Sequence, residues 1–317
     1  MSPFFAKTLK ITNLFLSPLG VRLQACKPRR WFPPPTVLTR VGGFEIEVPT
    51  INPICDHYER FPDYMAHLGR LAGLVQKVCP GFSTIDVGAN VGDTACILKA
   101  ACPGTPVLCI EGDAFTFGFL QKNVSRLPGV QAICQFLGES SGSLSVRVGK
   151  AGWNTTLVPG TGANSQALSL RSLDDVIADH PEFRGAKLLK VDAEGFDCRI
   201  LRGARQLLET ARPIVTFEYN RENMREIGEN GKDTIEMLMQ LGYSALALHD
   251  SDGRFFAGVE LQNTRFIQDI HNYADGTNGA IYYFDMTVFH SEDEKVAIQF
   301  FDIERQALRG PSGATNL

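Results

Sequence analysis

Residues 83–98 read STIDVGANVGDTACIL, and this stretch decides the fold that the sequence predicts. A short β-branched and apolar run at 84–87 leads into the turn GANVG at 88–92, and helix-forming apolar residues follow from Ala95. A buried strand that enters a glycine-rich turn and then a helix is the opening of a nucleotide-binding α/β domain. The residues of the turn indicate which ligand it holds.

The turn departs from two common phosphate-binding patterns. A dinucleotide fold needs a second glycine two residues after the first, and here Asn90 stands two residues after Gly88. No Lys-Ser or Lys-Thr pair follows the turn, so the P-loop pattern also fails. The carboxylate of Asp86 before the turn and the polar Asn90 at the mouth of the helix suit a ligand with an amino-acid end and no phosphate.

A second apolar run, Val107–Ile110, ends in Glu111 about 20 residues after the turn. An acidic residue at the end of the second strand hydrogen-bonds a ribose diol in folds of this kind. Ribose, adenine and a zwitterionic tail together describe S-adenosylmethionine, which is therefore the predicted cofactor.

Three sequence blocks resemble the FkbM family of S-adenosylmethionine-dependent methyltransferases. They are TIDVGANVGDT, LCIEGDAFTFGFLQKNV and LLKVDAEGFDCRILRGA, and they occur in that family's order over roughly residues 82–219. The resemblance implies a class I methyltransferase fold, Rossmann-like, with a doubly wound seven-stranded sheet whose final strand is antiparallel. It also implies hydroxyl acceptors on saccharides or polyketide-like metabolites.

Alternating apolar patterns predict the same α/β architecture along the chain. Strands are expected at 84–87, 107–111, 131–137, 187–192, 214–218, 244–249 and 280–289, with a small hairpin around 144–148. Helices are expected at 94–101, 116–126, 172–178, 198–210 and 233–241.

Three regions follow from these patterns. Residues 1–80 are expected to form an N-terminal basic extension and a cap, with a proline-rich linker at 33–35, a strand at 44–48 and a helix at 62–78. Residues 81–290 form the S-adenosylmethionine-binding domain, and 291–317 form a C-terminal tail with a frayed end. The polar run DHYER at 56–60 is expected as a solvated loop, or as part of a cap over the cofactor.

The charge of the chain is unevenly distributed. The formal net charge is −4, yet the first 44 residues contain seven basic residues and no acidic one. A basic arm on an acidic domain, a contact with a membrane surface or anionic substrate, and a cleavable targeting segment all remain open. No recognisable nucleic-acid-binding module accompanies these residues, so nucleic acid is not an expected partner.

No apolar run is long enough to span a bilayer. The eight cysteines are scattered without a C-x-x-C pair, which favours free thiols over structural disulfides or zinc. A reducing compartment is therefore expected, and the predicted location is the cytoplasm, with membrane association through the basic segment left open. The oligomeric state is not predicted.

The cofactor-binding residues are expected around the first three strand ends. Asp86, Gly88, Ala89, Asn90 and Gly92 should bind the methionine end, with Asp86 reaching its ammonium group directly or through water. Glu111, next to Gly112, should bind the ribose hydroxyls. Gly138 and Glu139, after the third strand, should border the adenine.

Three carboxylates, Asp192, Glu194 and Glu218, are the candidate catalytic residues. They follow neighbouring strands, and three carboxylates in a closed site cannot all ionise cheaply. One of them acts as a base, or Mg²⁺ or Mn²⁺ held by Asp192 and Glu218 neutralises them, or Lys190 and Arg221 compensate them structurally.

The remaining candidates are histidines and one aromatic segment. His57 in the cap is an alternative base, as are His249 and His271, although each alone is more often a structural histidine. Trp153 with residues 154–156 is expected either to line a sugar-binding mouth or to form a turn.

The sequence thus predicts an O-methyltransferase acting on a hydroxyl of a saccharide, glycolipid or related metabolite. Two alternatives keep a nucleotide-binding fold: a catalytically silent cofactor-binding or scaffold protein, and an NAD-dependent oxidoreductase. Asn90 in place of the second glycine disfavours the oxidoreductase. The identity of the acceptor is not predicted.

Overall fold

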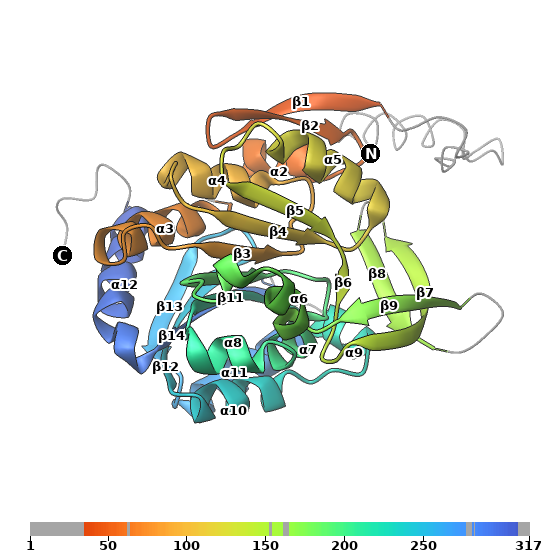
Figure 1. Cartoon of the computed structure of the whole chain (residues 1–317). Coiled ribbons are helices and arrows are strands. Elements are labelled where there is room, and N and C mark those ends of the chain that lie inside the picture. Colours follow the sequence, from red (N-terminus) through yellow and green to blue (C-terminus); the bar gives the residue numbers. More distant parts are fainter. Residues whose placement is uncertain are drawn as a thin grey trace, which may run out of the picture.

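A central sheet of eight strands organises the chain (Figure 1). The computed structural model describes residues 35–61, 64–151, 154–160, 165–276, 281 and 283–309. The strands lie in the order β13-β12-β14-β11-β10-β3-β4-β5. Their bounds are β3 Thr84–Val87, β4 Val107–Glu111, β5 Val130–Cys134, β10 Leu188–Val191, β11 Ile214–Tyr219, β12 Tyr243–Asp250, β13 Phe255–Glu260 and β14 Phe284–His290.

The pairing of these strands confirms the predicted class I methyltransferase fold. Strands β5, β4, β3, β10 and β11 run parallel, whereas β14 is antiparallel to both β11 and β12. The sheet differs from the expected seven strands because β13 pairs with the outer side of β12. Gly258 weakens the strand signal of β13, and a Cβ at this position would lie 2.7 Å from the ring of Phe301.

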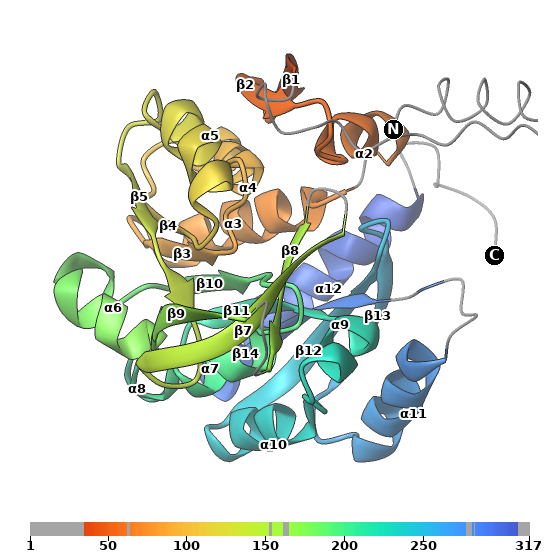
Figure 2. The ribbon, with the colours of Figure 1, turned by 90° about the vertical axis from the view of Figure 1, so that its right-hand side faces the viewer.

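Helices cover both faces of the sheet, as Figure 2 shows. One face packs against α3 Ala66–Val78, α4 Asp93–Ala101, α5 Ala114–Val124 and α12 Glu294–Arg309. The other packs against α6 Leu173–Asp179, α7 Asp197–Arg202, α8 Arg205–Thr210, α9 Arg221–Glu226, α10 Lys232–Gln240 and α11 Thr264–Asp275. The helix predicted at 198–210 is split at Gly203, where a Cβ would lie 2.4 Å from the carbonyl oxygen of Gly138.

None of the helices among the described residues has the length and apolar character needed to cross a membrane.

The N-terminal part of the described chain consists of a hairpin and a short helix. Strands β1 Thr36–Val41 and β2 Phe44–Pro49 pair antiparallel, and their turn at Gly42 lies against α4. The DHYER run, expected as a loop, instead forms most of helix α2, Ile54–Arg60. Tyr58 Oη donates a hydrogen bond of 2.9 Å to Asp93 Oδ2, which ties α2 to α4. Most of the basic extension, residues 1–34, lies outside the described residues.

A second, four-stranded sheet follows β5. It has the order β6-β9-β7-β8, with bounds β6 Phe136–Leu137, β7 Gly142–Ala151, β8 Asn154–Pro159 and β9 Gln166–Arg171. The strand predicted at 131–137 is therefore two strands, which meet at Gln135, where the backbone N–H donates to the carbonyl oxygen of Glu111. Trp153 lies outside the described residues, and residues 154–156 form strand rather than turn.

The C-terminal helix α12 corrects the predicted tail. Its apolar face contains Val296, Ala297 and Phe300, which are buried against the sheet and α3. The apolar side chains recur at helical spacing, so the segment gains stability by burying one face. Residues 294–309 are thus part of the folded core, and a boundary at residue 290 does not separate a tail from it.

Replacing Phe300 by Ala tests this role of α12. Phe300 is fully buried, so Phe300→Ala should lower the free energy of unfolding by about 3–5 kcal/mol. Ile298→Ala, on the exposed side of the same helix, should change it by no more than about 0.5 kcal/mol. Urea unfolding followed by circular dichroism measures both. Equal, small effects would show that α12 is dispensable for stability.

Candidate active site

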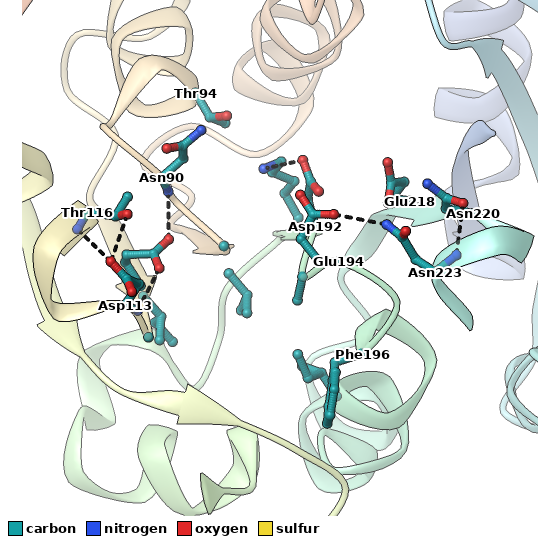
Figure 3. Close-up of a pocket in the computed structure, with 18 of the residues that line it drawn as sticks. Asn90, Thr94, Asp113, Thr116, Asp192, Glu194, Phe196, Glu218, Asn220 and Asn223 are labelled. Carbon is teal, nitrogen blue, oxygen red and sulfur yellow. Dashed lines mark hydrogen bonds and ion pairs between the residues drawn. The ribbon is translucent and has the colours of Figure 1, made fainter. Parts of the chain in front are cut away.

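A single cavity of about 410 Å³ lies at the carboxyl ends of β3, β4, β10 and β11. This edge is where open α/β sheets bind their ligands. Figure 3 shows two groups of side chains across it. The turn end is lined by Asn90, Thr94, Glu111, Gly112, Asp113, Thr116 and residues 135–137, and the acid end by Lys190, Asp192, Glu194, Glu218, Glu222 and Asp285.

The glycine turn after β3 is shaped by its contact with β10. Gly88 has φ of +73°, and a Cβ there would lie 1.7 Å from the carbonyl oxygen of Asp192. Only glycine allows this approach and this backbone conformation. Asn90, with φ of +49°, lines the cavity, and its side-chain oxygen accepts a hydrogen bond of 3.3 Å from Asn52 of the cap.

Two residues of the turn have packing roles instead of the expected ligand contact. Ala89 is buried and does not line the cavity. Gly92 begins α4 with φ of +91°, and a Cβ there would lie 2.8 Å from the side chain of Val124 in α5. The prediction for these two positions is therefore corrected, because they face the helix layer.

Glu111 joins the turn to the start of α5. Its Oε2 accepts a hydrogen bond of 3.0 Å from the backbone N–H of Asn90, and its Oε1 accepts one of 2.8 Å from that of Asp113. Burial raises the pKa of Glu111 to about 7, although the two N–H groups oppose the shift. Each carboxylate oxygen has a further lone pair, so Glu111 can also accept hydrogen bonds from a ligand diol.

Asp86 lies below the cavity and not in its wall. Its side chain is fully buried in β3, and its Oδ1 is 3.5 Å from Nζ of Lys190 on the neighbouring strand β10. Burial raises the pKa of Asp86 to about 6, while the ammonium of Lys190 opposes the shift. Asp86 is therefore not placed for the expected direct contact with a ligand ammonium group, and a contact through water stays a prediction; its partner Lys190 does line the cavity.

The wall after β5 also differs from the prediction. Gly138 and Glu139 line a separate hollow, where Glu139 Oε2 accepts a hydrogen bond of 3.0 Å from Nε of Arg202. Residues 135–137 line the cavity in their place, because the chain turns away from the main sheet at β6. Gly112 lines the cavity as expected, and a Cβ there would lie 2.1 Å from the ring of Phe136.

The three predicted carboxylates meet at the acid end. Asp192 Oδ2 lies 3.3 Å from Nζ of Lys190, and Glu194 Oε2 accepts a hydrogen bond of 2.9 Å from Nδ2 of Asn223. Lys190 therefore compensates one of the three predicted carboxylates, Asp192. Arg221 does not, because its guanidinium pairs with Asp275 at 3.2 Å, away from the cavity.

Asp285 is a fourth carboxylate that sequence reasoning missed. It lies directly opposite Glu218 in the β11–β14 pairing, and both line the cavity. Burial and, to a lesser extent, the carboxylate of Asp192 raise the pKa of Asp285 to about 8. Burial, followed by Asp192 and Glu194, also raises the pKa of Glu218 well above its usual range. An aspartate inside the apolar run FDMTVF was the available signal.

Aromatic side chains of the cap complete the wall. His57 of α2 lines the cavity and stacks on Tyr64, with ring centroids 5.1 Å apart, and Tyr283 lines the cavity as well. The other two candidate histidines do not line it. His249 contacts Glu304 at 3.1 Å beneath α12, and His271 Nδ1 lies 2.8 Å from Tyr219 Oη.

Among the residues that the structure describes, no group of three or more His, Cys, Asp or Glu side chains is arranged to hold a metal ion.

The raised pKa of Asp285 predicts a pH-dependent stability. Its folded pKa of about 8 lies above its unfolded value of about 4, so the fold favours the neutral acid. The stability from this group is complete below pH about 4 and is lost as pH rises to about 8. Asp285→Asn should therefore match the wild-type melting temperature near pH 4 and exceed it by several degrees above pH 8.

Differential scanning calorimetry of the ligand-free protein measures this difference. Glu209→Gln, on the exposed side of α8, is the control and should show no such trend. A difference between Asp285→Asn and wild type that stays constant with pH would contradict the shifted pKa.

Comparisons with known proteins place the chain in a family. The family model described as the methyltransferase FkbM domain matches residues 86–245, half of the chain. Hexuronic acid methyltransferase AglP of Haloferax volcanii is 28% identical over 131 residues, which cover 41% of this chain and 53% of that protein. Methyltransferase 1 of Beauveria bassiana is 26% identical over 141 residues, covering 38% and 57%. The chain thus spans about half the length of these relatives.

Among solved structures, a member of this family also matches at low identity. The crystal structure of methyltransferase FkbM from Methylobacillus flagellatus is 17% identical, with a TM-score of 0.39, and the match covers 58% of this chain and 45% of that chain. The family match includes the glycine turn, Glu111 and the strand that ends in Asp192. This protein belongs to the FkbM methyltransferase family.

Proposed function

We propose that this protein is an S-adenosylmethionine-dependent O-methyltransferase that acts on a hydroxyl group of a saccharide, glycolipid or related metabolite. One observation carries the proposal: a single cavity joins Glu111 and the glycine turn at one end to a group of carboxyl side chains, among them Glu218 and Asp285, at the other. A methyl transfer needs such a joint site, because donor and acceptor must be aligned and shielded from water.

The turn end fits the cofactor. The cavity of about 410 Å³ lies within the size range of small-molecule sites. In this proposal Glu111 binds the ribose hydroxyls. Asn90 and Thr94 contact the amino-acid end of the cofactor, and residues 135–137 contact the adenine. When bound, S-adenosylmethionine supplies an electrophilic methyl group on a sulfonium.

The acid end fits the acceptor hydroxyl and its proton. Asp192 Oδ2 lies 3.3 Å from Nζ of Lys190, and this ion pair holds the side chain in place to orient the hydroxyl. Glu218 has one oxygen that is buried without a hydrogen-bond partner among the described residues, and its pKa is raised. A carboxylate with a raised pKa is the stronger base, so Glu218 is the proposed proton acceptor.

The lining of the acid end favours a polyhydroxylated acceptor. Carboxylates and the amides of Asn220 and Asn223 provide hydrogen-bonding groups, while the rings of Tyr64, Tyr283 and His57 provide flat apolar surface. The name of the Haloferax relative, a hexuronic acid methyltransferase, supports a sugar acceptor at 28% identity.

Mass spectrometry with labelled cofactor tests the proposed reaction. The protein is incubated with methyl-labelled S-adenosylmethionine and a panel of saccharides, glycolipids and small polyols. The expected result is a labelled methyl ether on a hydroxyl. Binding of the cofactor with no transfer to any member would favour the scaffold alternative, and binding of NAD instead would favour the oxidoreductase.

Glu111→Ala tests the cofactor assignment. Loss of its carboxylate should weaken binding of S-adenosylhomocysteine, the demethylated cofactor, by about 1–3 kcal/mol because buried polar partners are left unmatched. Glu139→Ala is the matched control, since Glu139 lies outside the cavity, and should bind normally. Isothermal titration calorimetry measures both affinities. Unchanged affinity in Glu111→Ala would overturn the ribose assignment.

Glu218→Gln tests the proton acceptor. The substitution keeps the shape but removes the base, so turnover should fall by about 10²–10⁴-fold while S-adenosylhomocysteine affinity stays within a few-fold. The pH profile of kcat should also lose its acidic limb. Asp192→Asn should lose turnover as well, but retain that limb. If Glu218→Gln keeps normal turnover and pH profile, the base is another residue, and Asp285 is the next to test.

A further inference from the structure

The acid end of the cavity is lined by more acidic than basic side chains. Asp192, Glu194, Glu218, Glu222 and Asp285 line it, and Lys190 is the only lysine or arginine among the described residues of the cavity wall. The turn end differs, because its carboxylates, Glu111 and Asp113, accept hydrogen bonds from backbone N–H groups.

The charge of Lys190 does not compensate the whole group. Its Nζ lies 3.5 Å from Asp86 and 3.3 Å from Asp192, so two carboxylates already share it. The ammonium is buried together with Asp86 and is fixed by this pairing. Glu218 and Asp285 have no ion pair with a lysine or arginine among the described residues.

Asp285 and Glu218 are built into the cavity wall and are left without partners. The side chain of Asp285 is 7% exposed and has no hydrogen bond or ion pair among the described residues. Oε2 of Glu218, opposite it in the strand pairing, is buried and likewise without a hydrogen-bond partner. A buried carboxylate without a partner is costly unless a ligand provides one.

We propose that the methyl acceptor bears an ammonium group, and that Asp285 and Glu218 bind this group at the acid end. This inference rests on the proposed function, because it names the acceptor class of the same site. The acceptor is then an aminated saccharide or a similar amino polyol, with the ammonium close to the methylated hydroxyl.

An ammonium group fits these residues better than the other substituents of a sugar. It donates three hydrogen bonds, and its positive charge would pair with the carboxylate forms of Glu218 and Asp285, which have no cationic partner among the described residues. A hydroxyl donates one hydrogen bond and leaves the charge uncompensated. A carboxylate would add a like charge to a closed, acid-lined site, which opposes binding.

Three probes that differ only at one carbon test the charge preference. These are 6-amino-6-deoxyglucose, glucose and glucuronate, in which C5 carries an ammoniomethyl, a hydroxymethyl and a carboxylate group, respectively. Saturation-transfer difference NMR measures their dissociation constants at pH about 8, where an alkyl amine is still protonated. The amino sugar should bind at least about tenfold more tightly than glucose, and glucuronate more weakly than glucose.

Variants of the protein show which residue causes the preference for the amino sugar. Asp285→Asn should reduce the advantage of the amino sugar over glucose to about threefold or less, while the affinity for glucose stays within about threefold of wild type. Glu139→Gln, outside the cavity, is the control and should keep the full advantage. Retention of the full advantage in Asp285→Asn would overturn the assignment of the residue.

Equal affinities for the three probes, including the case in which none binds, would overturn the ammonium proposal, and so would tighter binding of glucuronate. The titrations are run with and without saturating S-adenosylhomocysteine. If the wild-type protein does not bind S-adenosylhomocysteine, the proposed function is overturned. If it binds S-adenosylhomocysteine but shows no preference for the amino sugar, only this inference is overturned.

Discussion

The buried ammonium of Lys190 holds the two central strands and the cavity together. Burial opposes its charged form, but the carboxylates of Asp192 and Asp86 raise its pKa well above the usual range, so it remains an ammonium. Because β3 and β10 are paired with Lys190 opposite Asp86, the contact is fixed by the sheet. A buried charge pair of this kind is costly to break, since removal of one partner leaves the other unpaired.

The same pairing determines the shape of the turn end. Gly88 follows β3 and lies against the carbonyl oxygen of Asp192, which follows β10. The backbone N–H of Asp192 donates a hydrogen bond of 3.0 Å to the carbonyl oxygen of Val87. Any side chain at residue 88 would separate these strand ends, and Lys190 would then lose its position between Asp86 and Asp192. The glycine turn is thus required by strand packing as much as by a ligand.

The sequence predicted those features that depend on neighbours along the chain. The strand, turn and helix around Gly88 and the carboxylate at Glu111 follow from local patterns. The position of Asp285 beside Glu218 could not be found in this way, because it depends on the insertion of β14 between β11 and β12. The same holds for Glu139, whose position depends on the turn of β6 into a second sheet. The helix α12 differs, because its amphipathic pattern is local and visible in the sequence.

The C-terminal helix also contributes to the chemistry of the acid end. Strand pairing places Glu218, Asp285 and His249 in one row across β11, β14 and β12. α12 covers the end of this row, where Glu304 accepts two hydrogen bonds from Arg70 and lies 3.1 Å from His249. Burial lowers the pKa of His249, so this neighbour of Asp285 supplies no compensating positive charge at neutral pH. The segment that reads as a tail therefore positions His249, the strand neighbour of Asp285, while burial is the main cause of the raised pKa of Asp285.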